Sequence, residues 1–211
     1  MATISALPKL VETLLAGPRP LPILTAGDPL LRSPAVPYDG QLDGRLWDRL
    51  ITAMREAMHA APGVGLAAPQ IGVPLRLAVV EDPAQVEQEV ARARGRLPLP
   101  FRVLVNPSYE PVDAERAAFY EGCLSVPGWQ AVVARHARVR LRGQDERGQE
   151  LDEELAGWPA RIVQHETDHL DGMLYLDRAI TRSLASARAM EERWTQPTPA
   201  AAARALGFEL P

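Results

Sequence analysis

Proline limits the folds open to this chain more than any other residue type. It occupies 20 of the 211 positions, about 9% against an average of about 5%. Because proline has a fixed φ angle and no backbone N–H, it interrupts helices and sheets. Many of the prolines lie near the chain ends or between apolar runs, where they indicate loops. Residues 18–40 are too rich in proline and glycine for long regular structure, so an extended, turning segment is predicted there.

Size and composition indicate one soluble globular domain. The chain is long enough for a single sizeable core. Its hydrophobic fraction of 46% and charged fraction of 24% are typical of soluble proteins, and no internal repeat or second domain is evident over residues 1–211. The formal net charge of -4 argues against a nucleic-acid-binding protein as a whole, so DNA is not an expected partner.

Cysteine use and hydropathy give an expectation for the compartment. Cys123 is the single cysteine and cannot form an internal disulfide, which fits a reducing environment. No apolar run approaches the roughly 20 residues of a membrane span. The N-terminus has neither the basic and apolar regions of a signal peptide nor the arginine content of a transit peptide. A cytoplasmic protein without membrane contact is therefore expected.

The first half of the chain predicts two helices and one strand. Apolar residues share one face over residues 4–15, which predicts a short amphipathic helix. Leucines and methionines recur every four residues from about Asp39 to Pro62, which predicts a longer one. Leu75 to Val80 is typical of a buried strand. Residues 83–100 are charged and have no clear apolar stripe, so a surface insertion is expected there.

The second half predicts strands, then helices. Residues 101–107 and several runs within 119–155 have strand character, with partial alternation of apolar and polar positions. Helices are predicted over about 158–170 and 181–194, and the proline- and alanine-rich tail 195–211 is expected to be disordered. The mixture indicates an α+β fold: one domain, with antiparallel β-sheets around a central metal-binding helix.

The helix over residues 158–170 carries the residues that point to chemistry. His165 and His169 are four positions apart, so their side chains share one face. Two imidazoles in this arrangement can hold one divalent ion, and Glu166 between them can reach a bound water. Pro159 suits the first turn of such a helix and Gly172 suits the position after its end. The plainer interpretation is a pair of histidines with accidental spacing; we favour the metal site.

A catalytic metal site needs a third protein ligand and an open fourth position. An elongated protease pattern would place that ligand at position 175, where the chain has Tyr175, a poor ligand. Glu191 and Glu192 are distal carboxylates in a polar run that is typical of a solvated surface. Cys123 is the better candidate, although a lone cysteine is more often a small buried hydrophobe. Its position within EGCLS, beside a glycine, favours the ligand role.

Three motifs together resemble the peptide deformylase family. GVGLAAPQ stands at residues 63–70, EGCLS at 121–125 and QHETDHLDG at 164–172, in the family's order. ILTAGDPLLR at 23–32 is similar to the family's N-terminal segment. The resemblance covers a core of about residues 21–182, and no catalytic position departs from the family pattern.

The resemblance implies an amide hydrolase that removes the formyl group from the N-terminal methionine of newly made proteins and releases formate. Cys123, His165 and His169 would hold one divalent ion, and metal-bound hydroxide would attack the formyl carbon with Glu166 as general base and then general acid. Ligand softness suggests zinc or iron. The resemblance favours Fe²⁺, with Zn²⁺, Ni²⁺ or Co²⁺ able to occupy the site.

Further site residues follow from the same resemblance. The Gln70 amide and the backbone N–H of Leu124 would stabilise the oxyanion. An ordinary loop amide is the plainer interpretation of Gln70. Gly63 and Gly65 are expected to permit unusual φ and ψ angles and the close approach of an extended substrate.

The resemblance also implies how a formyl-methionyl peptide binds. The peptide backbone would pair with Val64, Gly65 and Gly122 as an added strand. Its methionine side chain would enter an apolar pocket formed by Val64, Trp158 and Ile162. Core packing is the plainer interpretation of Trp158 and Ile162, and both roles can hold.

Asp168 lies in the helix predicted over residues 158–170, between the two candidate histidine ligands and close enough to help orient them. Groups around a metal site fix the rings and carboxylates that bind the ion. Asp168 is predicted to pair with Arg135 for this purpose, with a solvated helix charge as the alternative of equal weight.

Two other functions fit parts of the sequence. A zinc metalloprotease could use the same helix with a third ligand after His169. A deformylase-like binding module could dock on the ribosome without turnover. Transient ribosome contact of a monomeric enzyme is a related expectation, through RNA phosphates. A solvated helix face is the preferred interpretation of the four arginines that could support it, which are Arg178, Arg182, Arg188 and Arg193.

Overall fold

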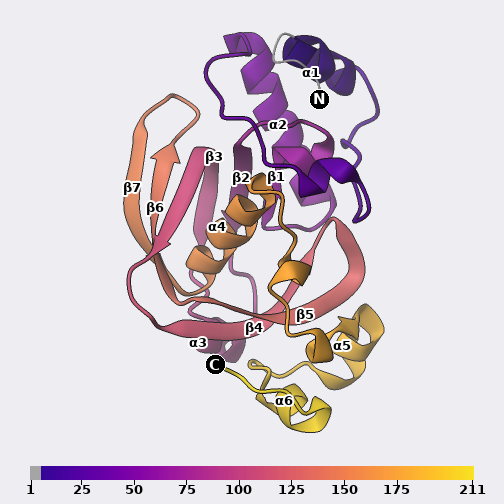
Figure 1. The fold of residues 1–211 in the computed structure, drawn as a ribbon, viewed down its shortest axis with the longest axis vertical. Helices are drawn as coiled ribbons and strands as arrows, with labels where there is room; N and C mark the ends of the chain where they lie inside the picture. Colours follow the sequence, from indigo (N-terminus) through magenta and orange to yellow (C-terminus); the bar gives the residue numbers. More distant parts are fainter. Residues whose placement is uncertain (1–5) are drawn as a thin grey trace.

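Two antiparallel sheets frame the molecule in the computed structural model, which describes residues 6–211 (Figure 1). The larger sheet has the order β1-β2-β3-β6-β7 and the smaller sheet the order β4-β5-β8. Every neighbouring pair is antiparallel. The strands are β1 (Gly65–Ala67), β2 (Leu77–Asp82), β3 (Leu99–Pro111), β4 (Arg116–Cys123), β5 (Val126–His136), β6 (Arg138–Gln144), β7 (Glu150–Ala156) and β8 (Ala185–Ser186).

Residues 6–211 also contain six α-helices and four short 3-10 helices. The α-helices are α1 (Leu7–Leu15), α2 (Gly44–Ala60), α3 (Gln88–Arg94), α4 (Gly157–Leu170), α5 (Ala187–Arg193) and α6 (Ala200–Leu206). The 3-10 helices are η2 (Pro29–Arg32), η3 (Ala68–Ile71), η4 (Tyr175–Asp177) and η5 (Thr181–Ser183). None of these helices is both long and apolar enough to cross a membrane.

The alternation of side chains along β2 produces a core on each face of the larger sheet. Leu77 and Val79 point into a cluster with α1 and α2. Ala78 and Val80 point to the opposite face, into a cluster with α4. All four are fully buried, as expected for a central strand covered on both sides. The strand prediction for this segment is confirmed.

Helix α4 lies between the two sheets (Figure 1) and contacts strands of both, so nearly all of its residues are buried. Gly172 follows the helix with φ +76°, a left-handed conformation that favours glycine. The predicted α+β fold, with antiparallel sheets around this helix, is confirmed.

Helix boundaries differ from the predictions where capping residues decide them. The second helix begins at Gly44 rather than near Asp39, because the Asp43 side chain accepts a hydrogen bond from the Leu46 N–H at 2.8 Å. The first helix is present over Leu7–Leu15, and the start of its predicted range lies outside the described residues.

The prediction for the C-terminal region is wrong in two respects. Residues 181–194 do not form one helix, because η5 and β8 precede α5 and the Ser186 hydroxyl caps α5 by accepting from the Ala189 N–H at 3.3 Å. The tail is also structured: α6 buries Ala202 in a cluster with Tyr120 of β4. Small alanine side chains allow this close packing, although the proline- and alanine-rich composition of residues 195–211 suggested disorder.

The surface insertion at residues 83–100 contains a helix. Helix α3 has no buried residue, in agreement with a surface position. It ends at Gly95, which has φ +54° and lies against Gly157 at the start of α4.

Candidate metal centre and substrate pocket

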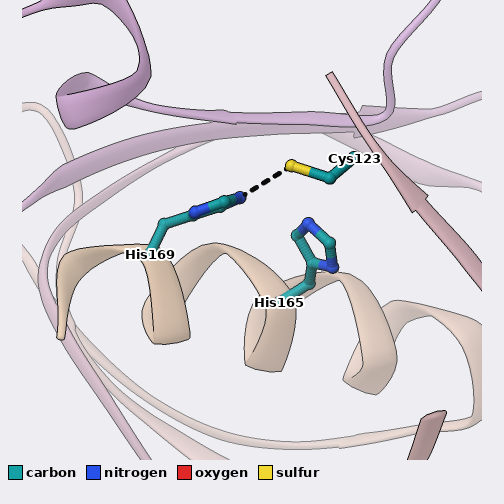
Figure 2. A group of neighbouring side chains, drawn as sticks. All are labelled: Cys123, His165 and His169. Carbon is teal, nitrogen blue, oxygen red and sulfur yellow. Dashed lines mark hydrogen bonds between the residues drawn. The ribbon is translucent and has the colours of Figure 1, made fainter. Parts of the chain in front are cut away.

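Three side chains from two segments that are distant in the sequence converge at one point. Cys123 ends β4, whereas His165 and His169 lie one helical turn apart on α4. Their ligand atoms all lie within 4.8 Å of one another, and Cys123 Sγ is 3.2 Å from His169 Nε2. Figure 2 shows the sulfur and both rings facing a common point. Across residues 6–211 this is the one such group of three or more His, Cys, Asp or Glu side chains.

A local irregularity at the end of β4 changes the direction of the Cys123 side chain. The pairing of β4 with β5 shifts register between Gly122 and Cys123, so that Cys123 pairs with Val126. A β-bulge of this kind changes the direction of the next side chain. The Ser125 N–H lies 3.4 Å from the sulfur and donates to it.

A buried network of charges fixes His165. Glu121 Oε2 lies 3.0 Å from His165 Nδ1. Arg135 donates to the same carboxylate through Nε at 2.7 Å and Nη2 at 2.9 Å, and Arg161 Nη1 donates to Oε1. Burial would raise the pKa of Glu121, but Arg135, His165 and Arg161 outweigh burial and hold that pKa well below its usual range. Glu121 therefore remains ionised and fixes the ring.

The predicted pairing of Asp168 with Arg135 is confirmed. Arg135 Nη1 lies 2.8 Å from Asp168 Oδ2, and both side chains are 2% exposed. The Tyr109 hydroxyl and Arg178 also donate to Asp168, at 2.9 and 2.8 Å. Arg135 thus joins Glu121 of β4 to Asp168 of α4.

The roles of Glu121 and Arg161 escaped the sequence analysis. Glu121 is part of the EGCLS motif and stands two positions before the predicted ligand, which was the available signal. Arg161 is one turn before His165 on α4, where a charged residue in a buried stretch could have indicated an ion pair.

The residues around the sulfur suit a divalent cation. Burial lowers the pKa of His165, but the neighbouring Cys123 and Glu121 outweigh it and raise that pKa to about 10, so a positive charge is favoured here, which a bound divalent ion would supply in place of the ring proton. Burial and His165 lower the pKa of His169 well below its usual value, which keeps that imidazole neutral, as a ligand must be. One sulfur and two imidazole nitrogens form a donor set that suits zinc or iron.

Glu166 has the surroundings of a catalytic carboxylate. It is 4% exposed, and its Oε2 atom has no hydrogen-bond partner within residues 6–211. Burial raises the pKa of Glu166 to about 7. A Cβ atom on Gly65 would lie 2.5 Å from Glu166 Cδ, so a larger residue at this position would displace the carboxylate. Gly63 is similarly close to Leu124, and neither glycine has a positive φ angle, so close contact rather than a left-handed backbone is what the structure shows at these two positions.

Gln70 is held rigidly beside the cysteine. Its Oε1 accepts the Ala67 N–H at 2.8 Å, and its Nε2 donates to Ser125 Oγ at 3.1 Å and lies 3.6 Å from Cys123 Sγ. The side chain is 1% exposed. The amide is therefore fixed near the three ligand atoms rather than being an ordinary loop amide.

A cavity of about 600 Å³ opens beside the ligand cluster. With the exception of the fully buried His169, every predicted site residue lines it: Val64, Gly65, Gln70, Gly122, Cys123, Leu124, Trp158, Ile162, His165 and Glu166. Other lining residues were not predicted, including Arg94, Arg96, Trp129 and Arg161.

The comparisons with known proteins assign the chain to a family. The family model described as polypeptide deformylase matches residues 20–184. The chain belongs to the polypeptide deformylase family. Peptide deformylase 1 of Streptomyces coelicolor is 72% identical over 201 residues, which cover 95% of this chain and 92% of that protein. The mitochondrial peptide deformylase of Homo sapiens is 38% identical over 181 residues, or 82% of this chain and 74% of that protein.

Solved deformylases share the fold. The peptide deformylase of Synechococcus elongatus in complex with actinonin has a TM-score of 0.66 at 32% identity, over 92% of this chain and 91% of that one. The Met-Ala-Ser-bound class I type b deformylase of Acinetobacter baumannii has a TM-score of 0.67 at 33% identity, over 75% of this chain and 97% of that one.

A deformylase arrangement agrees better with the ligand geometry than a protease arrangement. The Tyr175 hydroxyl donates to the Trp129 carbonyl at 3.0 Å, and its ring stacks on His165 with centroids 6.2 Å apart. Glu192 accepts from Arg188 at the surface. The third side chain beside the two histidines is the upstream Cys123.

The four arginines considered for ribosome contact do not share one helix, so their expected placement on a single helix face is wrong. Arg178 follows η4 and pairs with the buried Asp168, and Arg182 donates to the Leu206 carbonyl at 3.3 Å. Arg188 and Arg193 lie on α5, where Arg188 pairs with Glu192.

Proposed function

We propose that this deformylase-family chain hydrolyses the N-formyl group from the N-terminal methionine of newly synthesised proteins and releases formate. The observation that carries the proposal is the convergence of Cys123, His165 and His169 beside the buried Glu166, at the edge of a cavity. The ligands provide a position for a metal, the carboxylate provides a proton acceptor, and the cavity provides room for a peptide end.

Cys123, His165 and His169 would hold one divalent ion. When bound, such an ion supplies a Lewis acid that polarises the formyl carbonyl and makes water easier to deprotonate. Fe²⁺ is favoured on the family resemblance, with Zn²⁺, Ni²⁺ or Co²⁺ as possible occupants. Glu121 keeps the His165 ring oriented through Nδ1, which leaves the other ring nitrogen to face the ion.

Glu166 is the proposed general base and then general acid. Its pKa of about 7 allows the carboxylate to accept a proton from the attacking water near neutral pH and to return it to the leaving amine as the C–N bond breaks. The oxygen that lacks a hydrogen-bond partner, Oε2, is the available proton acceptor.

Gln70 and Leu124 are the proposed donors to the developing oxyanion. The fixed Gln70 amide lies beside the ligand cluster, and a neutral amide donor keeps its hydrogens at any physiological pH. The backbone N–H of Leu124, next to Cys123, is proposed as the second donor. Preorganised donors lower the barrier because they need no reorientation as charge develops.

The peptide would bind as an added strand between two segments that line the cavity. Val64 and Gly65 would pair with the backbone on one side and Gly122 on the other, while the methionine side chain would contact Val64, Trp158 and Ile162. The Met-Ala-Ser peptide bound to the Acinetobacter baumannii enzyme supports a ligand that begins with methionine.

Formate release by anaerobically purified protein tests the proposal. The protein is incubated with a formyl-methionyl peptide, and formate and bound metal are measured on the same preparation. We expect formate in proportion to occupied sites. No formate at any loading of Fe²⁺, Zn²⁺, Ni²⁺ or Co²⁺ would remove the proposal.

A Cys123→Ser variant separates the proposal from a metalloprotease. Loss of bound metal and of formate release supports the deformylase. Retained cleavage of internal peptide bonds would favour the protease. Monomeric state, cytoplasmic location and transient ribosome contact stay predictions.

A further inference from the structure

Trp158 forms part of the pocket wall at the start of α4. It lies in the first turn of α4, lines the cavity and contacts Phe119 edge-on, with ring centroids 6.2 Å apart. Ile162 and Glu166 follow on the same helix at intervals of four, so Trp158, Ile162 and Glu166 share one face. The indole therefore forms part of the cavity wall two helical turns before the carboxylate.

Three guanidinium groups lie close to this indole. The Cζ atoms of Arg94, Arg96 and Arg161 are 5.1, 5.4 and 5.6 Å from its ring centroid. Two of these cations are neutralised by carboxylates, because Arg161 pairs with Glu121 and Arg96 binds Asp82 at 2.8 Å. Cation–π contacts of this kind fix both the cation and the ring.

Arg94 is the cation without a carboxylate. Within residues 6–211 it pairs with no acidic side chain, and its Nε donates to the Pro197 carbonyl at 3.2 Å. Burial, with Arg96 and Arg161 nearby, lowers the pKa of Arg94. The Trp158 and Phe119 rings supply the electron-rich surroundings that partly offset its burial.

The backbone holds the same two segments together. The Trp158 N–H donates to the Gly95 carbonyl at 3.2 Å. A Cβ atom on Gly157 would lie 2.5 Å from that carbonyl oxygen, and one on Gly95 would lie 3.3 Å from Gly157 Cα. Residues 94–96, at the C-terminal end of α3, are thus packed directly on the first turn of the metal helix.

We propose that residues 94–96 of the surface insertion position Trp158 as a wall of the methionine pocket, and that Arg94 thereby determines which N-terminal side chains the enzyme accepts. Arg94 is a positioning residue, because it acts on the substrate through the indole. This inference rests on the proposed function, since it assumes that Trp158 contacts the methionine.

Arg94→Met is the principal test, because methionine keeps much of the side-chain length but loses the charge and the bond to Pro197. Two quantities are measured: the Kd of the peptide Met-Ala-Ser, and kcat and KM for formyl-Met-Ala-Ser and formyl-Ala-Ala-Ser. We expect Met-Ala-Ser binding and the preference for formyl-methionine to fall about 3- to 10-fold, through KM, with kcat within about two-fold. Arg94→Lys should retain most of the preference, and bound metal should be unchanged.

Matched variants control for general effects. Arg92→Met changes an exposed arginine of the same helix and should leave both quantities unchanged. Gly157→Ala should reduce the preference further through its clash with Gly95. Gly207→Ala, which has a similar φ of +68° but no atom within 3.6 Å of the added Cβ, controls for backbone strain.

The possible failures are distinguishable. If the wild-type protein is active but Arg94→Met leaves both the affinity for Met-Ala-Ser and the preference for formyl-methionine unchanged, this inference alone is overturned. It is also overturned if Arg92→Met loses as much affinity and preference as Arg94→Met. Wild-type protein that releases no formate from either peptide overturns the proposed function and this inference with it.

Discussion

Among the carboxylates of residues 6–211, Glu166 is the one that is buried without an arginine partner. Glu121, Asp82 and Asp168 are equally buried, but each binds at least one guanidinium group. An ion pair holds a carboxylate ionised, whereas the surroundings of Glu166 let it gain and lose a proton near neutral pH. At the scale of single residues, the pairing of each acid therefore separates structural from chemical roles.

Glu166→Gln should abolish most activity and leave the metal in place. Glutamine keeps the shape of the side chain but cannot accept the proton, so we expect kcat/KM to fall by about 10²- to 10⁴-fold. Formate release and metal content are measured together. Glu191→Gln, at an exposed position, is the control. Activity within a few-fold of wild type in Glu166→Gln would exclude the proposed base.

Arg135→Ala should weaken both the fold and the metal site. The substitution leaves Glu121 and Asp168 buried without their shared cation, a loss of about 3–5 kcal/mol in the free energy of unfolding. Because Glu121 orients His165, metal affinity should fall by about 10- to 100-fold. Chemical denaturation and chelator competition measure the two effects.

Arg138→Ala is the matched control, since Arg138 pairs with Asp113 and Glu154 at the surface. Exposed pairs contribute about 0–1 kcal/mol, so this variant should resemble wild type. Similar results for the two arginine variants would contradict the role assigned to Arg135.

At the scale of elements, the ends of α4 determine where its ligands lie. Gly157, with φ +62°, starts the helix against Gly95, and Gly172, just after its end, lies against the backbone of Arg32. Both ends are thus fixed by glycines in close contact with other segments. The histidines between them cannot shift along the helix axis without breaking one of these contacts.

Gly172→Ala should destabilise the protein more than the same change in an open turn. Gly172 has φ +76°, and an added Cβ would lie 2.9 Å from the Arg32 carbonyl carbon. Gly148 has φ +78° with nothing within 4 Å, so Gly148→Ala isolates the backbone strain, about 1–2 kcal/mol. Urea denaturation of both variants gives the comparison, and equal losses would show that the packing against Arg32 is unimportant.

At the scale of the whole molecule, the ligand cluster connects the two sheets. Cys123 belongs to the three-stranded sheet, and α4, which carries both histidines, packs against strands of the five-stranded sheet. An ion bound by all three side chains would tie these parts together. Its binding free energy would then contribute to the stability of the folded chain.

Removal of metal should therefore lower the Tm. With free ion at 100 times its Kd, binding contributes about 2.7 kcal/mol, which corresponds to about 5–10 °C for a chain of this size. Thermal unfolding with and without a chelator measures the shift. Cys123→Ser should lose most of the chelator effect, and a wild-type Tm that is insensitive to chelator would contradict a structural contribution of the ion.

Local patterns in the sequence predicted most of the central elements. The four-residue spacing of His165 and His169 and the terminal signals Pro159 and Gly172 are properties of α4 alone. Alternation and apolar runs likewise predicted the strands, because a strand's two faces follow directly from the order of its residues. The three motifs identified the residues that the structure brings together around the cavity.

Only the tertiary structure decided which distant groups touch. The bonds of Arg135 and Arg161 to Glu121, the packing of Gly95 on Gly157 and the docking of α6 beside Tyr120 join residues that are at least 14 positions apart in the chain. No local pattern encodes such contacts, because the energy of a buried ion pair or a close backbone contact depends on where both partners lie after folding. The sequence by itself determined helix α4, most of the strands and the three candidate ligands. Folding decided which ion pairs and close contacts hold those ligands in place.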